Sequence, residues 1–176
     1  LGGQNASLRE FLAAIAVLEP LVGRQKSRVA AADALIDAYR AAGTSADAWR
    51  VAAVRLHEGP PGPARTVDLA GLALDRGAVE TALHMAVAAR QGDPDIAPRS
   101  HAIEARALVS SGRSAEALAA VSLIPSEQLD EPGALAWLES TCDMHGRSRA
   151  LQLAKTLGPR ASTWSEVLAR IALWTA

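Results

Sequence analysis

The chain has 176 residues, enough for one ordinary domain, and 49% of them are hydrophobic, which is enough to bury a core. Its formal net charge of −1 lacks the basic excess typical of a nucleic-acid-binding protein, so we expect no nucleic-acid partner. The lone Cys142 excludes an internal disulfide framework, and no apolar run reaches the ~20 residues of a membrane-spanning helix. We identify no targeting segment, so cytoplasmic and periplasmic locations both stay open.

Alanine takes the place of the aromatic side chains that fill many protein cores. Only 3% of the residues are aromatic. Alanine is the best helix former, whereas β-branched and aromatic residues favour strands. The composition therefore predicts an all-α fold of closely packed helices.

The beginning of the chain predicts an amphipathic helix. Five apolar residues recur at helical spacing before Pro20, namely Leu8, Phe11, Leu12, Ile15 and Leu18. This face resembles the second helix of a helix pair whose first helix is missing.

Four glycines then follow at nearly constant spacing. Gly43, Gly77, Gly112 and Gly146 are 34, 35 and 34 residues apart, and each lies between two helix-like stretches. A tight turn between antiparallel helices needs a residue that tolerates a positive φ angle, and glycine does so without steric cost. The spacing therefore predicts four helix pairs, each with a glycine in its central turn.

Small residues and prolines recur in step with these glycines. Each turn is followed by an alanine that permits close helix packing, at Ala48, Ala82, Ala117 and Ala150. Each second helix is followed by a proline that ends it, at Pro60, Pro94, Pro125 and Pro159. The last two prolines come sooner after their glycines, which predicts shorter second helices in the later units.

The first helices carry apolar residues on one face, but the quality of this face falls along the chain. The first copy has Ala32, Leu35, Ile36 and Tyr39, and the second has Thr66, Leu69, Ala70 and Ala73. The third copy is poorer, with His101, Glu104, Ala105 and Leu108, and the fourth has Leu135, Leu138, Glu139 and Cys142. After the last proline, Trp164, Val167, Leu168, Ile171 and Trp174 predict a further apolar helix face.

These features together resemble the tetratricopeptide repeat family, and the stretch Gly-Arg-Ser-Ala-Glu-Ala-Leu at residues 112–118 does so most closely. The early tryptophan of that family is replaced by Ala32, Thr66, His101 and Leu135. The resemblance implies a right-handed α-solenoid of antiparallel helix pairs with about ten helices. It would form a single helical-repeat domain over residues 1–176, with units at approximately 29–62, 63–96, 97–130 and 131–160 and partial units at 1–28 and 161–176.

The resemblance also implies a concave groove lined by the first helix of each unit. We expect its side chains thirteen, ten, six and three positions before each glycine. The predicted partner-binding residues are Asp33, Asp37, Arg40, Val67, Leu74, Arg99, Arg106 and Asp143. Such a groove is acidic in the first unit, apolar in the second and basic in the third, which matches a peptide of mixed charge. Because Asp33 and Asp37 would repel a carboxylate, we disfavour recognition of a peptide's terminal carboxylate.

The sequence contains no motif for catalysis. We find no phosphate-binding loop, dinucleotide-binding fingerprint or nucleophile elbow, and we expect neither enzymatic activity nor a cofactor. Cys142 and His145 are half of a possible metal site, but no second pair lies near, so we expect no metal. Ser114 and Ser148 are interpreted as helix N-caps rather than anion sites. The scattered histidines and tryptophans are interpreted as surface and packing residues respectively.

We therefore predict a non-catalytic scaffold that binds a partner peptide or protein in the concave groove, with possible self-association through the helical ends. One alternative is a tetratricopeptide segment of a bacterial secretion or exopolysaccharide-export machine, since tetratricopeptide arrays are common in such machines. The high alanine and arginine contents hint at a GC-rich bacterial genome. Another is the regulatory region of a larger enzyme such as a glycosyltransferase. The identity of the partner does not follow from the sequence.

Overall fold

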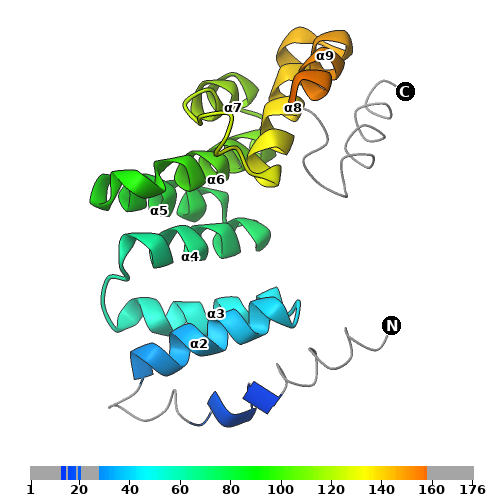
Figure 1. Cartoon of the computed structure of the whole chain (residues 1–176). Helices are drawn as coiled ribbons and strands as arrows, with labels where there is room; N and C mark the ends of the chain where they lie inside the picture. Colours follow the sequence, from blue (N-terminus) through cyan, green and yellow to red (C-terminus); the bar gives the residue numbers. More distant parts are fainter. Residues whose placement is uncertain (1–12, 15, 19, 21–27, 158–176) are drawn as a thin grey trace. The chain divides into compact units, whose positions relative to one another are not determined.

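The computed structural model describes residues 13, 14, 16–18, 20 and 28–157 (Figure 1). Residues 28–157 form eight α-helices and one 3-10 helix, and the described residues include no strand. The all-α fold class is therefore confirmed. The predicted helix at residues 8–18 is described only at 13, 14 and 16–18, which are helical, and the predicted helix at 164–174 lies outside the described residues.

Each of the four repeated glycines lies between two helices, as the glycine spacing predicts. They are α2 (Arg28–Ala41), α3 (Ser45–His57), α4 (Pro63–Asp75), α5 (Val79–Gly92), the 3-10 helix η2 (Pro94–Ile96), α6 (Ala97–Ser110), α7 (Ser114–Val121), α8 (Glu131–His145) and α9 (Arg147–Leu157). The chain divides into two compact units, one of residues 1–61 and 75–77 and the other of residues 62–74 and 78–176.

The four repeated glycines all have a positive φ angle, between 73° and 80°. At Gly112 the turn is closed by backbone hydrogen bonds, in which Gly112 donates to the carbonyl of Val109 and Arg113 donates to the carbonyl of Leu108 over 2.8 Å. A left-handed residue here ends α6 and satisfies carbonyls that the helix leaves unpaired. The structure thus confirms the predicted role of these glycines.

The repeated alanines and prolines also have the predicted places. Ala48, Ala82, Ala117 and Ala150 are all fully buried. The second helices α3, α5 and α7 end before Pro60, Pro94 and Pro125, whereas Pro159 lies outside the described residues. Helix α7, with 8 residues, is shorter than α3, with 13, and α5, with 14. Pro94 begins the 3-10 helix.

In the first unit α2 packs on α3. Leu35 and Ile36 of α2 are fully buried, and Val51 lies on the buried face of α3. The two helices are also joined by an ion pair, in which Arg55 donates to Asp33 over 3.2 Å. Arg55 is only 7% exposed, and it also donates to the carbonyl of Gly59, so the buried cation is fully engaged.

In the second unit the helices from α5 to α9 pack mostly on their neighbours in sequence. The packed pairs are α5 with α6, α6 with α7, α7 with α8 and α8 with α9, and α6 also packs on α8. The core of this unit includes Leu72, Leu108, Val121 and Leu138, each at most 4% exposed. These helices therefore form successive packed hairpins.

Two glycines of the second unit should respond oppositely to alanine. Gly112→Ala places a Cβ at φ +73°, where no neighbouring atom obstructs it, so the cost is backbone strain of about 1 kcal/mol. Gly71 lies inside α4, and its added Cβ would meet only Ile103 at an ordinary contact distance of 3.7 Å. Gly71→Ala should therefore stabilise the helix by about 0.5–1 kcal/mol. Urea unfolding measures both changes, and a destabilised Gly71→Ala variant would contradict the assigned helix.

Candidate functional site

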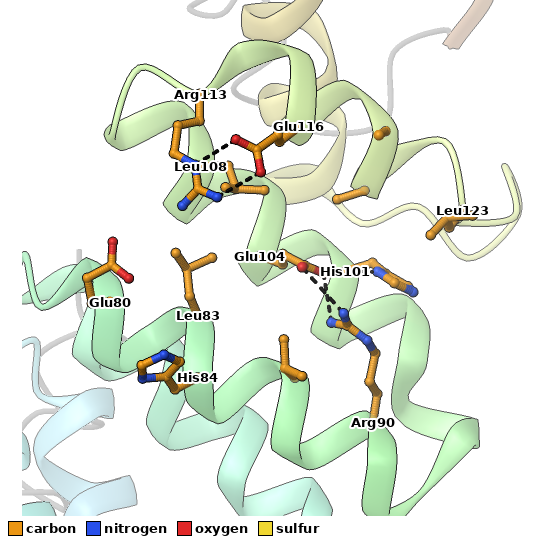
Figure 2. A pocket seen from close by; sticks show the side chains of 13 residues that line it. Glu80, Leu83, His84, Arg90, His101, Glu104, Leu108, Arg113, Glu116 and Leu123 are labelled. Carbon is orange, nitrogen blue, oxygen red and sulfur yellow. Dashed lines mark hydrogen bonds and ion pairs between the residues drawn. The ribbon is translucent and has the colours of Figure 1, made fainter.

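An open cleft of about 520 Å³ lies between α5, α6 and α7 in the second unit (Figure 2). Its lining comes from one face of each helix. The residues are Glu80, Leu83, His84, Val87 and Arg90 from α5, His101, Glu104 and Leu108 from α6, and Arg113, Glu116, Ala119, Ala120 and Leu123 from α7 and its flanking turns. Their spacing of three or four residues is that of a single helix face.

The middle of the cleft is apolar. Leu83, Leu108 and Ala120 form its floor and are 8%, 4% and 7% exposed. Leu123 lies at the margin and is 64% exposed, because α7 ends at Val121 and the following turn carries this side chain out of the helix packing. A cleft lined by apolar side chains, with a large exposed one at its margin, is a feature of binding surfaces.

One end of the cleft is closed by a network of charged and polar side chains. Arg90 of α5 donates to both carboxylate oxygens of Glu104 of α6, over 2.7 and 3.3 Å. The Nδ1 atom of His101 lies 3.2 Å from Glu104, and Ser100, fully buried, donates to the carbonyl of Ala86. A two-pronged guanidinium–carboxylate contact fixes orientation as well as distance. This network joins α5 to α6.

The opposite end of the cleft carries two acidic side chains and one basic side chain. Arg113 donates to Glu116 over 2.8 and 2.7 Å. The hydrogen bond with Glu116 raises the pKa of Arg113, and the nearby charge of Glu80 adds to the rise. The hydrogen bond from Arg113 in turn lowers the pKa of Glu116. Two carboxylates thus share the surroundings of one guanidinium, and Figure 2 shows all three side chains at the same end.

None of the predicted groove residues lines this cleft, and two of them are not on the surface. Val67 is fully buried and Leu74 is 8% exposed. Helix α4 buries residues around much of its circumference, because Leu69, Ala70, Leu72 and Ala73 are buried as well. The prediction that Val67 and Leu74 face a partner was therefore wrong, since it assumed that only one narrow face of this helix is covered.

Three other predicted groove residues join helices to one another. Asp33 pairs with Arg55, Arg99 pairs with Asp68 of α4 over 2.7 Å, and Asp143 accepts a hydrogen bond from Ser114 over 2.6 Å. Asp37 and Arg40 are exposed on α2, and Arg106 is half-buried on α6. A role of these residues in partner binding stays a prediction.

The two serines predicted as N-caps lie inside their helices instead. Ser114 is the first residue of α7, whose N-cap is Arg113, and its hydroxyl donates to Asp143 of α8. Ser148 is the second residue of α9. Ser114 therefore links α7 to α8 rather than capping a backbone N–H group.

The cleft residues could have been noticed from one signal in the sequence. His101 and Glu104 occupy positions that hold Ala32 and Leu35 in the first copy, where both are fully or almost fully buried. Polar side chains at core positions of a repeat indicate that the packing there differs from the packing in the first copy. Leu123 gave no such signal, because its exposure depends on where α7 ends.

Cys142 and His145 do not belong to a metal cluster in the part of the chain that the structure describes, where no group of three or more candidate ligands lies together. Cys142 is half-buried, and burial, with a smaller contribution from Asp143, raises the pKa of its thiol. Within residues 13–157, as far as they are described, no helix is both long and apolar enough to cross a membrane.

No family model, no curated protein and no solved structure matches the chain. The tetratricopeptide resemblance accordingly stands on the repeat pattern of the chain itself.

The Arg90–Glu104 pair should contribute more stability than the Arg113–Glu116 pair. The side chains of Arg90 and Glu104 are only 24% and 18% exposed, so Glu104→Ala leaves a half-buried cation without its main partner. We expect a loss of about 1–2 kcal/mol in the free energy of unfolding. Glu116→Ala is the control, because water screens its exposed pair and little stability should be lost. Equal losses in urea unfolding would contradict the structural role of the buried network.

The raised pKa of Cys142 predicts slow alkylation. The thiolate is the nucleophile, and a thiol whose pKa lies above its usual value is protonated at neutral pH. Iodoacetamide should modify native Cys142 more slowly than it modifies the urea-unfolded chain, with a rate that still rises above pH 9. A native rate that equals the unfolded rate and levels off below pH 8 would show a lowered pKa instead.

Proposed function

We propose that the chain is a non-catalytic protein-interaction module of the tetratricopeptide kind, whose helix pairs stack as a right-handed solenoid and present a surface to a protein partner. The cleft between α5, α6 and α7 is the binding surface in this proposal. The observation that carries it is the apolar lining of the open cleft, which combines the buried side chains of Leu83 and Leu108 with the exposed side chain of Leu123.

The repeat geometry supports the tetratricopeptide assignment. Glycines with positive φ angles recur at nearly 34-residue intervals, and a fully buried alanine follows each of them. In the second unit α6 packs on α5, α7 and α8, so the first helix of one repeat contacts the first helix of the next. This is the packing that stacked helix pairs require.

The chemistry of the cleft favours binding over catalysis. Arg90 pairs with Glu104, and Arg113 pairs with Glu116, so these charged groups bond to one another. They do not converge on a common point at which a reacting atom could be held. An apolar centre between polar ends is the arrangement of a protein-binding surface, in which the centre supplies most of the affinity.

Leu123→Asp should abolish partner binding without unfolding the chain. The side chain is 64% exposed, so a carboxylate there remains hydrated in the free protein but would be buried in the complex. Met144→Asp is the matched control, since Met144 is 49% exposed and does not line the cleft. The immobilised proteins would be compared in pull-downs from a lysate of the source cells, with circular dichroism to verify folding.

A third variant, Asp37→Arg/Arg106→Glu, tests the groove that the sequence predicted. A partner retained by the unmodified chain, by Met144→Asp and by Asp37→Arg/Arg106→Glu, but lost by Leu123→Asp, would support the cleft. A partner lost only by the double variant would locate binding on the first helices and overturn the assignment of the cleft.

A further inference from the structure

We infer that the cleft selects a partner segment in which an apolar side chain is followed, about one helical turn away, by a lysine or arginine. The apolar side chain would lie over Leu83 and Leu108, and the basic group would lie beside Glu80 and Glu116. This inference rests on the proposed function, because it specifies the chemistry of the partner at that same site.

The apolar part follows from the lining of the centre. Leu83, Val87, Leu108 and Ala120 present hydrocarbon, and Ala119 and Ala120 are too small to fill the space between α7 and α5. The cleft of about 520 Å³ has room for one or two large side chains of a partner. Burial of such a side chain removes its hydrocarbon surface from water, which makes it the main anchor of the segment.

The basic part follows from the unequal charge of the two ends. At the Glu80 end the carboxylates of Glu80 and Glu116 line the cleft near one guanidinium, that of Arg113, which bonds to Glu116 (Figure 2). At the other end the charges of Arg90 and Glu104 compensate each other directly. A partner cation is therefore favoured at the first end only, and this asymmetry sets the direction in which a segment lies.

The spacing follows from the helix that carries both subsites. Glu80 and Leu83 are three residues apart on α5, which corresponds to a rise of roughly 4.5 Å along the helix axis. A helical partner matches this distance with apolar and basic residues three or four positions apart.

The test uses three blocked twelve-residue peptides and the whole chain labelled with ¹⁵N. The first peptide has two leucines, each followed three residues later by arginine, and the second has glutamate in place of arginine. The third keeps the arginines but has serine in place of leucine. Amide chemical shifts locate binding on the chain, and fluorescence anisotropy measures Kd at low and physiological salt.

The leucine–arginine peptide should shift amides of α5 and α7 and bind with a Kd about tenfold lower than the leucine–glutamate peptide, because exposed charge pairs each contribute modestly. Added salt should reduce this ratio. The serine–arginine peptide should not bind measurably.

Matched charge reversals then locate the selectivity. Glu80→Lys should reduce the tenfold preference for arginine over glutamate to about one. Glu127→Lys changes the net charge of the chain equally, but Glu127 lies outside the cleft, so the preference should remain. A preference that falls equally in both variants would reflect overall charge and would overturn the inference.

The remaining outcomes separate this inference from the proposed function. If both leucine peptides bind in the cleft with equal Kd, the inferred selection of a basic group is wrong while binding in the cleft stands. If no peptide shifts the cleft amides, the inferred partner chemistry is wrong, and the proposed function is then decided by the pull-down with Leu123→Asp.

Discussion

The structure depends on how closely the two helices of a pair approach, as α2 and α3, α6 and α7, and α8 and α9 do. That approach requires a side chain no larger than a methyl group where the helices meet, and a turn short enough to bring them together. The fully buried alanines Ala48, Ala82, Ala117 and Ala150 meet the first requirement, and the positive-φ glycines meet the second. Close packing of small residues also explains how a chain with 3% aromatic residues still has a buried core.

The cleft lies where the first helix of the third repeat departs from the apolar face of the first repeat. His101 and Glu104 stand at positions that are apolar in the first repeat, and Glu104 bonds to Arg90 and to His101 instead of filling a core. The short helix α7 ends at Val121, and the turn that follows carries Leu123 at the margin of the cleft. Polar side chains on α6 and a short α7 thus accompany a cleft whose floor is apolar and buried. The candidate site therefore lies at the third repeat, which matches its neighbours poorly.

The local chemistry of the sequence was sufficient to predict the helices, their turns and their order. Glycine and proline have strong positional effects on the backbone, so Gly43, Gly77 and Gly112 marked the turns reliably. Burial was harder to predict. Val67 and Leu74 were assigned to a groove by a fixed offset from the turn, yet α4 is covered on more sides than such an offset assumes. The burial of a side chain depends on which helices pack around its own helix. The spacing of residues within one helix does not specify those neighbours.

The candidate site could not be predicted for a related reason. Its residues come from three helices and two turns, and no short motif unites them. Only the polar residues at core positions of the third repeat gave a sign, and they mark one end of the cleft. The pairing of Arg90 with Glu104 spans two helices, whereas sequence spacing reveals pairs within a single helix, such as Arg113 with Glu116.

Site-specific photo-crosslinking in the source cells tests most directly whether the cleft is the partner-binding surface. A photoreactive phenylalanine analogue would replace His84, an exposed residue at the cleft, and in separate cells Asp37 on α2 or Met144 on α8. The account predicts a cross-linked protein from position 84 and none from positions 37 and 144. A cross-link from position 37 with none from position 84 would contradict it and would move the binding surface to the first helices.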